Sequence, residues 1–251
     1  MLAPEITTYR LQGSSEAPVV AEAVYHSLEA LADLTAYQRW TYNVVKSFIG
    51  ECVCDVGCGN GNFLRFLSDR QRVIGIDPFS SAIEAARRRF AGYSNVELVH
   101  AALEDCPNER IPPGSFDTVT CLRLLDSMED DIGAVERMGR LCRPGGFVVI
   151  VASAHRSAYG ALDRAFGHRR RYSRRALRNV FQAGRLSVTF SRFMNAPGYF
   201  GWLWYSRLLG CKQLPSGGAA FVNRVAPFLE QLEGILHPPF GQSIVMVGRR
   251  D

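Results

Sequence analysis

Short apolar runs alternate with stretches that carry apolar residues at helical spacing along most of the chain. An apolar run bounded by turn residues predicts a buried strand, and apolar residues three and four apart predict a helix. The runs that predict strands are 51–57, 72–77, 96–101, 116–125, 145–153, 187–193 and 242–248. The stretches that predict helices are 21–48, 60–70, 80–90, 131–141 and 173–181. Strands that alternate with helices predict an α/β fold with a doubly wound, mainly parallel sheet.

Two segments, 154–172 and 194–240, do not follow this alternation. A doubly wound sheet binds its ligands beyond the carboxyl ends of its strands. We therefore expect both segments to form a cap over that edge of a single domain, residues 21–251. Residues 1–20 are polar and punctuated by proline, glycine and serine, which predicts a loose N-terminal arm.

The composition is that of an ordinary globular protein, because 47% of the 251 residues are hydrophobic and 21% are charged. No run approaches the roughly 18 apolar residues of a transmembrane segment, and the first residues do not resemble a signal peptide. Seven cysteines without C-x-x-C spacing predict reduced thiols and a cytoplasmic protein. Cys52 and Cys54 share one face of a strand and Cys58 lies in the following turn, so we expect buried thiols and no metal site.

The 29 basic residues are arginines with two exceptions, Lys46 and Lys212. The planar guanidinium of arginine suits carboxylate and phosphate recognition, although a GC-rich genome also favours arginine codons. In the densest basic run, Arg169, Arg170 and Arg171 form either the solvated start of a helix or a cradle for an acidic acceptor. Basic and aromatic residues do not interleave along an exposed sheet, so we expect no nucleic acid partner.

The glycine-rich turn at 57–61 directly follows the first predicted strand. Glycine lets a ligand approach the backbone closely, and a helix starting near Asn60 would point free N–H groups into the same space. The next strand ends in Asp77, about 20 residues further on, where a carboxylate can accept hydrogen bonds from both ribose hydroxyls. Pro78 and Phe79 can then provide an apolar shelf for a base. The pattern favours a nucleotide-like ligand, while a plain strand–helix connection or an NAD site stays open.

Four motifs in order carry a resemblance to a known family: VCDVGCGNG, GIDPF, AALED and LCRPGGFVVIV. With these motifs the chain resembles the class I S-adenosylmethionine-dependent methyltransferases from about Ala36 to its end. The resemblance implies a seven-stranded Rossmann-like sheet whose last strand is antiparallel, with S-adenosylmethionine or S-adenosylhomocysteine as the ligand. Further segments, among them GHRRRY in the expected cap, resemble a bacterial subgroup often encoded beside glycosyltransferase or natural-product genes.

The resemblance also implies a cofactor site. The residues that it places there are Tyr37, Trp40, Asp55, Gly57, Cys58, Gly59, Asn60, Asp77, Pro78, Phe79, Leu103, Glu104 and Cys121. Asp55 would face the methionine ammonium, Asp77 the ribose, and the backbone N–H of Leu103 the adenine edge. Cys121 would lie under the sulfonium, and the two aromatic residues that begin the set would close over the amino-acid end.

The catalytic groups are harder to identify. The resembling subgroup carries a Glu-His pair after its fourth strand, whereas this chain reads LRLLDSMEDD there, without a histidine. The remaining candidates are Asp126, Tyr159, His168 and, first among them as a base or orienting group, His155. We expect methyl transfer to an O or N atom of a small metabolite, which is anionic if the arginines recognise it. Three outcomes are open: an acceptor that needs no base, a base from the cap, or a different reaction such as cyclisation or elimination.

The segment 195–210 is aromatic and apolar with few charges. Such a stretch is typical of buried packing or of a subunit interface, and it also fits a lid over an acceptor pocket. A homodimer or a small accessory protein could use it, and one alternative is that the chain is a non-catalytic partner subunit. Shallow membrane contact fits a lipid acceptor, but the charges that anchor a surface are not adjacent in the sequence.

Overall fold

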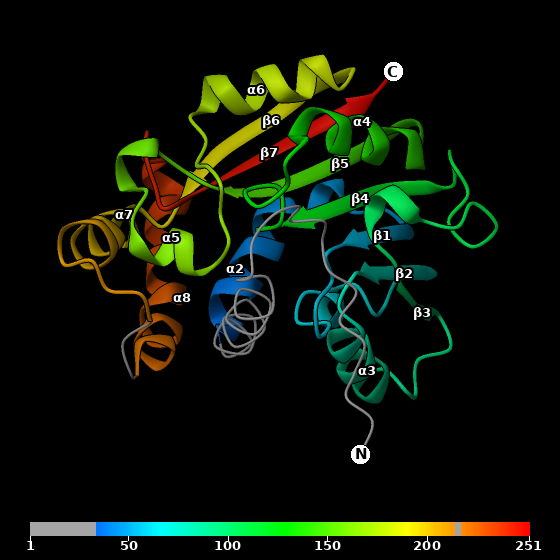
Figure 1. Cartoon of the computed structure of the whole chain (residues 1–251), viewed down its shortest axis with the longest axis horizontal. Helices are drawn as coiled ribbons and strands as arrows, with labels where there is room; N and C mark the ends of the chain where they lie inside the picture. The colour runs from blue at the N-terminus through cyan, green and yellow to red at the C-terminus, as the bar shows by residue number, and fades with distance from the viewer. Residues whose placement is uncertain (1–33, 214–216) are drawn as a thin grey trace, which may run out of the picture.

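Figure 1 shows the computed structural model, which describes residues 34–213 and 217–251. The predicted N-terminal arm and the part of the predicted helix that precedes Leu34 lie outside the described residues. One seven-stranded sheet has the order β3-β2-β1-β4-β5-β7-β6. Its strands are β1 Cys52–Val56, β2 Arg72–Asp77, β3 Val96–His100, β4 Phe116–Leu122, β5 Cys142–Ser153, β6 Leu186–Met194 and β7 Ser243–Arg250.

The direction of the strands confirms the predicted topology. Neighbouring strands from β3 to β5 are parallel, whereas β7 is antiparallel to both of its neighbours, β5 and β6. The sheet is therefore doubly wound and mainly parallel, with an antiparallel last strand. Its switch point lies between β1 and β4, because β2 and β3 lie on one side and β5 to β7 on the other. Ligands of such sheets bind at the carboxyl ends of the strands beside this point.

Helices cover both faces of the sheet (Figure 1). They are α2 Thr35–Val45, α3 Ser80–Arg89, α4 Asp131–Leu141, α5 Ala161–Ala165, α6 Arg174–Ala183, α7 Ala196–Trp202 and α8 Gly218–Leu236. In β5, Val148 and Ile150 join the core with α4 and α6, whereas Val149 and Val151 join the core with α2, α3 and α8. Successive side chains of a strand point to opposite faces, so a strand covered on both faces is continuously apolar.

The predicted helix at 60–70 is wrong. This stretch contains a short 3-10 turn, η2 (Leu64–Phe66), between irregular turns. Gly61 has a φ of 83°, and a Cβ there would lie 2.5 Å from the ring of Phe90, so the chain bends against α3 where a helix would start. The apolar residues that suggested a helix are buried in the core on this side of the sheet. Their spacing therefore reflects tertiary packing.

The two segments expected to form the cap both leave the same edge of the sheet. β5 and β6 are each antiparallel to β7, so they run in one direction and end at the carboxyl edge. Segment 154–172 contains α5, and segment 194–240 contains α7, a π-helical turn η5 (Leu203–Leu208) and α8. Figure 1 shows these elements together at one end of the molecule. Among the described residues, no helix is long and apolar enough to cross a membrane.

Candidate active site

The glycine turn after β1 keeps side chains away from the carboxyl edge. Gly57 and Gly59 have φ angles of 74° and 54°, in the left-handed region that favours glycine. The N–H groups of Gly57 and Cys58 donate hydrogen bonds to the carbonyl of Ile76 at 2.8 and 3.0 Å, which fixes the turn against β2. A Cβ on Gly57 would lie 2.6 Å from a methyl group of Leu124 in the loop after β4, so a side chain there would be strained by the positive φ and would displace Leu124.

Asp77, the last residue of β2, connects the glycine turn to the next loop. Its Oδ2 accepts a hydrogen bond from the Gly59 N–H and its Oδ1 accepts one from the Phe79 N–H, both at 2.9 Å. Burial raises the pKa of Asp77, and these two hydrogen bonds counteract part of the rise. Each carboxylate oxygen has two lone pairs, so each can accept one more hydrogen bond from a ligand hydroxyl.

Asp55 lies on the neighbouring strand β1 and is only 2% exposed. One of its oxygens accepts a 2.6 Å hydrogen bond from the hydroxyl of Thr120 on β4. Burial raises the pKa of Asp55 to about 7; the Thr120 hydrogen bond opposes this rise, and the negative charge of Asp77 adds to it. A cationic ligand would favour the ionised form, so this carboxylate is suited to a positively charged partner.

Three other residues of the predicted site surround the same turn. Cys58 and Cys121 are buried thiols, and burial raises the pKa of both. Cys121 lies opposite Val56 in the register of β4 and β1, which places it at the end of the strand that leads into the turn. The side-chain Oδ1 of Asn60 is buried without a hydrogen-bond partner in the described part of the chain. Because an unpaired buried acceptor costs about 1–3 kcal/mol, this oxygen is a candidate ligand contact.

The loops after β2 and β3 form the far side of the site. They lie against each other, since Nε2 of His100 is 2.9 Å from the carbonyl oxygen of Pro78. Leu103 and Glu104 belong to a 3-10 turn, η3 (Leu103–Asp105), that follows β3. The Leu103 side chain is buried in the core and the Glu104 side chain is exposed. This turn therefore has its backbone, rather than the Leu103 side chain, available for a ligand.

α2 carries the two aromatic residues of the predicted site. Tyr37 and Trp40 pack edge to face with 5.7 Å between ring centres, and both are buried. The Tyr37 hydroxyl donates a hydrogen bond to the Ser243 hydroxyl on β7 at 3.0 Å. Ser243 is paired with Ser153 at the end of β5, so this face of α2 reaches the carboxyl edge. The indole N–H of Trp40 is buried without a hydrogen-bond partner among the residues described.

Arg123 is a site residue that the sequence analysis missed. It directly follows β4, with a left-handed φ of 58°, and its N–H donates a hydrogen bond to the carbonyl of Val151 on β5. Its guanidinium lies 4.8 Å from the centre of the Tyr37 ring, a cation–π contact. No carboxylate of the described residues forms an ion pair with it. A single basic residue directly after a buried strand, in CLRLLD, was the available signal.

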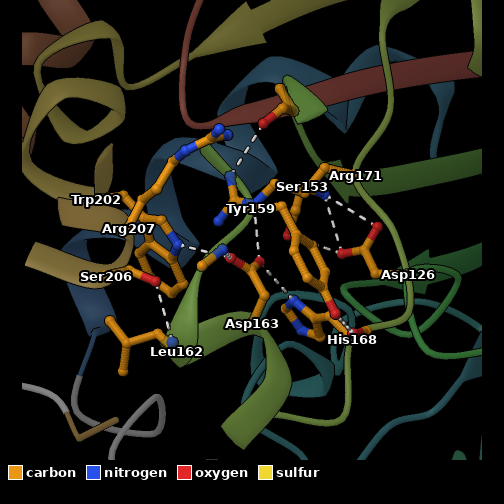
Figure 2. Close-up of polar contacts among 12 residues, drawn as sticks. Asp126, Ser153, Tyr159, Leu162, Asp163, His168, Arg171, Trp202, Ser206 and Arg207 are labelled. Atoms are coloured by element: carbon orange, nitrogen blue, oxygen red, sulfur yellow. Dashed lines mark hydrogen bonds and ion pairs between the residues drawn. The ribbon is translucent and has the colours of Figure 1, made fainter. Parts of the chain in front are cut away.

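Two of the predicted catalytic groups are engaged in internal hydrogen bonds. Asp126 is fully buried, and both of its oxygens accept hydrogen bonds from the backbone N–H or the hydroxyl of Ser153 at 2.8–3.1 Å (Figure 2). The Tyr159 hydroxyl donates a hydrogen bond to the carbonyl of His168 at 2.9 Å. These contacts argue against proton abstraction by Asp126 and favour a positioning role, in which it joins the loop after β4 to the end of β5.

A buried carboxylate, Asp163, organises the segment that follows β5 (Figure 2). It forms an ion pair with Nε of Arg171 at 2.7 Å, lies 3.3 Å from Nδ1 of His168, and accepts hydrogen bonds from the Gly160 N–H and the Trp202 indole. Burial alone would raise the pKa of Asp163, but these hydrogen bonds and the Arg171 charge outweigh it and hold the pKa below its ordinary value. The carboxylate thereby joins segments 154–172 and 194–240.

The predicted arginine cradle is not present, because the three side chains have different internal partners. Arg171 is buried, pairs with Asp163, and also donates to the carbonyl of Ala154. Arg170 pairs with Asp131 at 2.8 Å on the other side of the loop. Arg169 is the most exposed of the three, and its guanidinium lies 3.8 Å from Glu129. Although the three arginines are adjacent in the sequence, each one makes a separate structural contact.

A family model described as "Methyltransferase domain" matches residues 53–146, from β1 into β5. Residues 53–146 are thus similar to a methyltransferase domain. The match contains the glycine turn, Asp77 and the loop after β4, and it confirms the resemblance to the class I S-adenosylmethionine-dependent family over this part of the chain. The likeness to a narrower bacterial subgroup rests on residues outside the match and stays a prediction.

Known relatives agree with this domain. The ubiquinone biosynthesis O-methyltransferase of Paracidovorax citrulli is 33% identical over 102 residues, which cover 39% of this chain and 42% of the relative. The chain spans about half the length of the curated relatives that it matches. A solved geranyl diphosphate methyltransferase in complex with SAM has a TM-score of 0.61 at 17% identity, covering 96% of this chain and 92% of that one. The [4+2]-cyclase SpnF has a TM-score of 0.58 at 19% identity, over 85% and 81%. These two likenesses show the fold.

S-adenosylmethionine is the cofactor of this class of methyltransferase domain, and the described residues fit it. Asp77 retains acceptor capacity for two ribose hydroxyls, and Asp55 provides a buried negative charge for a sulfonium or ammonium group. The unpaired Oδ1 of Asn60 and indole N–H of Trp40 are further polar groups that a ligand can satisfy. The N–H groups of Gly57, Cys58 and Gly59 have partners within the protein, so the glycine turn contributes close approach of the backbone to the ligand.

Of the predicted catalytic groups, His155 makes the longest and weakest internal hydrogen bond. It follows β5 with a left-handed φ of 61°, and its ring stacks on Phe193 with centres 4.9 Å apart and meets Tyr199 edge-on. Burial lowers the pKa of His155, and the nearby Arg171 charge lowers it further, so the imidazole is neutral near pH 7. Its Nε2 is 3.5 Å from the Gly241 N–H, a weak contact that leaves the ring able to accept a proton.

Proposed function

We propose that this chain is an S-adenosylmethionine-dependent methyltransferase that acts on an O or N atom of a small-molecule acceptor. The observation that supports it best is the contact between the glycine turn and Asp77. The Gly59 N–H and the Asp77 carboxylate meet at 2.9 Å, where the carboxyl ends of β1 and β2 lie together. This leaves backbone and carboxylate side by side for a nucleoside, with the buried charge of Asp55 on the adjacent strand.

Bound S-adenosylmethionine supplies an already activated methyl group, so the protein has to align the reactants and exclude water. Asp77 holds the ribose through its free lone pairs. Asp55, which is buried, offsets the positive charge of the ligand. Tyr37 and Arg123 face each other beside the glycine turn, where Arg123 can bind the carboxylate of the amino-acid end.

Proton removal depends on the acceptor. An amine or an acid needs no strong base, whereas a hydroxyl loses about 10²–10⁴-fold in rate without one. His155 is our choice for that base, because its lowered pKa keeps it neutral and its Nε2 makes one weak contact. With Arg169, Arg170 and Arg171 engaged elsewhere, an anionic acceptor would have to meet Arg123 or another group. A role in bacterial natural-product or glycan biosynthesis remains part of this proposal.

The experiment has a binding arm and a transfer arm. Calorimetry with S-adenosylhomocysteine is expected to show binding that Asp77→Ala weakens at least tenfold, since hydrogen bonds to a charged group are worth about 1.5–3 kcal/mol each. Asp77→Asn keeps the shape but loses one of the two acceptors for the N–H groups of Gly59 and Phe79, so thermal unfolding of both Asp77 variants checks that the turn is intact. Glu84→Ala on the exposed surface of α3 is expected to bind normally. Methyl-labelled cofactor is then incubated with a panel of phenols, amines and carboxylic acids. Normal affinity in both Asp77 variants would contradict the cofactor assignment.

A second candidate function is a non-methylating reaction, such as a cyclisation, with the cofactor bound as a bystander. Two observations favour it: Asp126 and Tyr159 are engaged internally, and the fold is shared with a [4+2]-cyclase. The transfer arm separates the two candidates. Conversion of a pathway intermediate without label in the product and without consumption of cofactor would favour this second function over methyl transfer.

A further inference from the structure

Exposed apolar side chains are concentrated on one part of the molecule. Of the eleven large hydrophobic residues that are exposed in the described chain, nine lie between residues 200 and 236. We call these nine the apolar cap face: Phe200, Trp204, Leu208, Leu209, Phe221, Phe228, Leu232, Ile235 and Leu236. They come from α7, η5, the residue after η5, and α8, which lie at the same end of the molecule in Figure 1. Concentrated exposed apolar surface marks an interaction site in a folded protein.

α8 shows why this face is not a consequence of ordinary core packing. Its inward apolar residues, at 222, 226 and 229, are spaced along one helical face and pack on the side of α2, and Glu233 on the same face accepts hydrogen bonds from the N–H groups of Asn195 and Ala196. A second apolar row, at 221, 228, 232 and 235, has the same helical spacing and is exposed. The apolar sector of the helix therefore extends beyond its contact with the rest of the chain. A surface helix normally carries polar residues at such positions.

The accessible charges on this part of the chain are mainly basic. Lys212 and Arg224 are exposed, whereas Arg207, also exposed, donates a hydrogen bond to the carbonyl of Ser157. The two acidic residues of the same segment are engaged: Glu230 accepts a hydrogen bond from Asn43, and Glu233 is buried and accepts two backbone hydrogen bonds. An apolar face with a basic surround complements an anionic apolar partner. A second copy docked through the same face would place basic residues against basic residues.

We propose that the apolar cap face is a docking surface for an anionic phospholipid bilayer. Exposed aromatic residues favour the boundary between headgroups and acyl chains, where Phe200, Trp204, Phe221 and Phe228 would insert. The exposed side chains of Lys212 and Arg224 would meet the negative headgroups. α8 would lie along the bilayer surface with its unused apolar row inserted. The inference concerns binding alone and does not depend on which group the methyltransferase domain transfers.

Docking would also position the loops of the carboxyl edge. The Trp202 indole donates a hydrogen bond to Asp163, and the Ser206 hydroxyl accepts one from the N–H of Leu162, as Figure 2 shows. Both contacts join α7 and η5 to the segment that follows β5. A bilayer that holds α7 and η5 would therefore lie close to the segment that carries His155. This arrangement suits an amphiphilic acceptor, a consequence that rests on the proposed function.

Vesicle binding by the full chain tests the proposal. The probes are phosphatidylcholine vesicles and vesicles of phosphatidylcholine mixed with phosphatidylglycerol. We expect co-sedimentation with the anionic vesicles and a blue shift of tryptophan fluorescence. Trp204 is the reporter, because it is 61% exposed while Trp40 is buried and Trp202 is hydrogen-bonded to Asp163. Raised salt should weaken binding, since it screens the basic side chains.

Matched variants distinguish vesicle binding through the apolar cap face from nonspecific adsorption of the protein. Phe228→Gln and Ile235→Gln should each reduce vesicle binding about tenfold, because each removes the insertion of one large apolar side chain. Lys212→Gln and Arg224→Gln should each reduce it about fivefold on anionic vesicles. Ile132→Gln is the control, since Ile132 is also exposed but lies on α4. These exposed positions should leave the thermal unfolding midpoint unchanged.

Three results would overturn the proposal. One is equal affinity for neutral and anionic vesicles that the variants do not alter. Another is a homodimer in sedimentation equilibrium that dissociates in Phe228→Gln, which would assign the face to a second copy. The third is absence of vesicle binding together with a stoichiometric complex with an acidic protein, which would make the occupant a polypeptide. Binding of S-adenosylhomocysteine, measured in parallel, reports on the proposed function separately.

Discussion

Cofactor affinity is expected to fall as the pH is lowered through neutrality, because Asp55 must be ionised to attract a cationic ligand. Its pKa in the folded protein is raised to about 7 by burial, and the residue is 2% exposed. For a site with this pKa, about one protein molecule in ten carries the ionised group at about pH 6, and about nine in ten at about pH 8. If the ligand binds the ionised form, the apparent dissociation constant rises about tenfold between these conditions.

The same pKa shift affects the stability of the ligand-free protein, which is greater at low pH, whereas cofactor affinity is greater at high pH. The folded-state pKa lies above the unfolded value of 3.8, so the folded protein binds this proton more tightly. The resulting stabilisation is fully present below pH 3.8 and is lost as the pH rises through about 7, a total of about 4 kcal/mol. Asp55→Asn remains neutral and should lose this dependence. It should therefore be more stable than the parent protein at about pH 8, provided that the amide finds partners.

Calorimetric titration of the parent protein and Asp55→Asn with S-adenosylmethionine, at both pH values, measures the first effect. Urea unfolding at the same pH values measures the second. Asp77 is the necessary comparison, because burial also raises its pKa. A dissociation constant that changes less than about twofold in the parent protein would refute the role of Asp55. An equal slope in Asp55→Asn would assign the dependence to another group, and Asp77→Asn would then identify whether that group is Asp77.

Two further predictions concern groups outside this pair. Asp163→Asn should lower the free energy of unfolding by about 3–5 kcal/mol in chemical denaturation, because it leaves the Arg171 charge buried without its partner. The double variant with Arg171→Met should recover part of this loss. Additive effects of the two substitutions would contradict the coupling. The parent protein should lose this contribution as the pH falls from 3.8 through the lower folded-state pKa of Asp163. Arg123→Gln should weaken the binding of S-adenosylhomocysteine about tenfold and leave the binding of methylthioadenosine, which lacks the carboxylate, unchanged. Equal losses of affinity for both ligands, or the same loss in the control Arg169→Gln, would exclude carboxylate recognition.

The strands and the cofactor turn were predictable because their signals are local. A buried strand in a parallel sheet is apolar on both faces, so β1, β2 and β5 appear as continuous runs. Glycine at left-handed positions and an acidic residue at the end of the next strand indicate a backbone site for a nucleoside, and the structure places Asp77 on the Gly59 N–H. The family match over residues 53–146 falls on this same region.

The errors arose where long-range contacts decide the outcome. The apolar spacing at 60–70 arises from core packing, since Gly61 bends against Phe90 and no α-helix forms. Arg169 and Arg171, two residues apart, have partners on different parts of the fold, because a loop has no fixed periodicity that keeps its side chains on one face. Arg123 was missed because its importance depends on Tyr37, which is far away in the sequence.

By itself, the sequence determined the order of the seven strands, the glycine turn and the acids at Asp55 and Asp77, since each depends on neighbouring residues and on the period of burial. Only the tertiary structure decided which polar groups remain available. Asp126 is hydrogen-bonded to Ser153 and Asp163 is paired with Arg171, so these carboxylates are not available to a ligand. The apolar row of α8 is likewise exposed because α2 covers only one side of that helix, a fact that no local pattern contains.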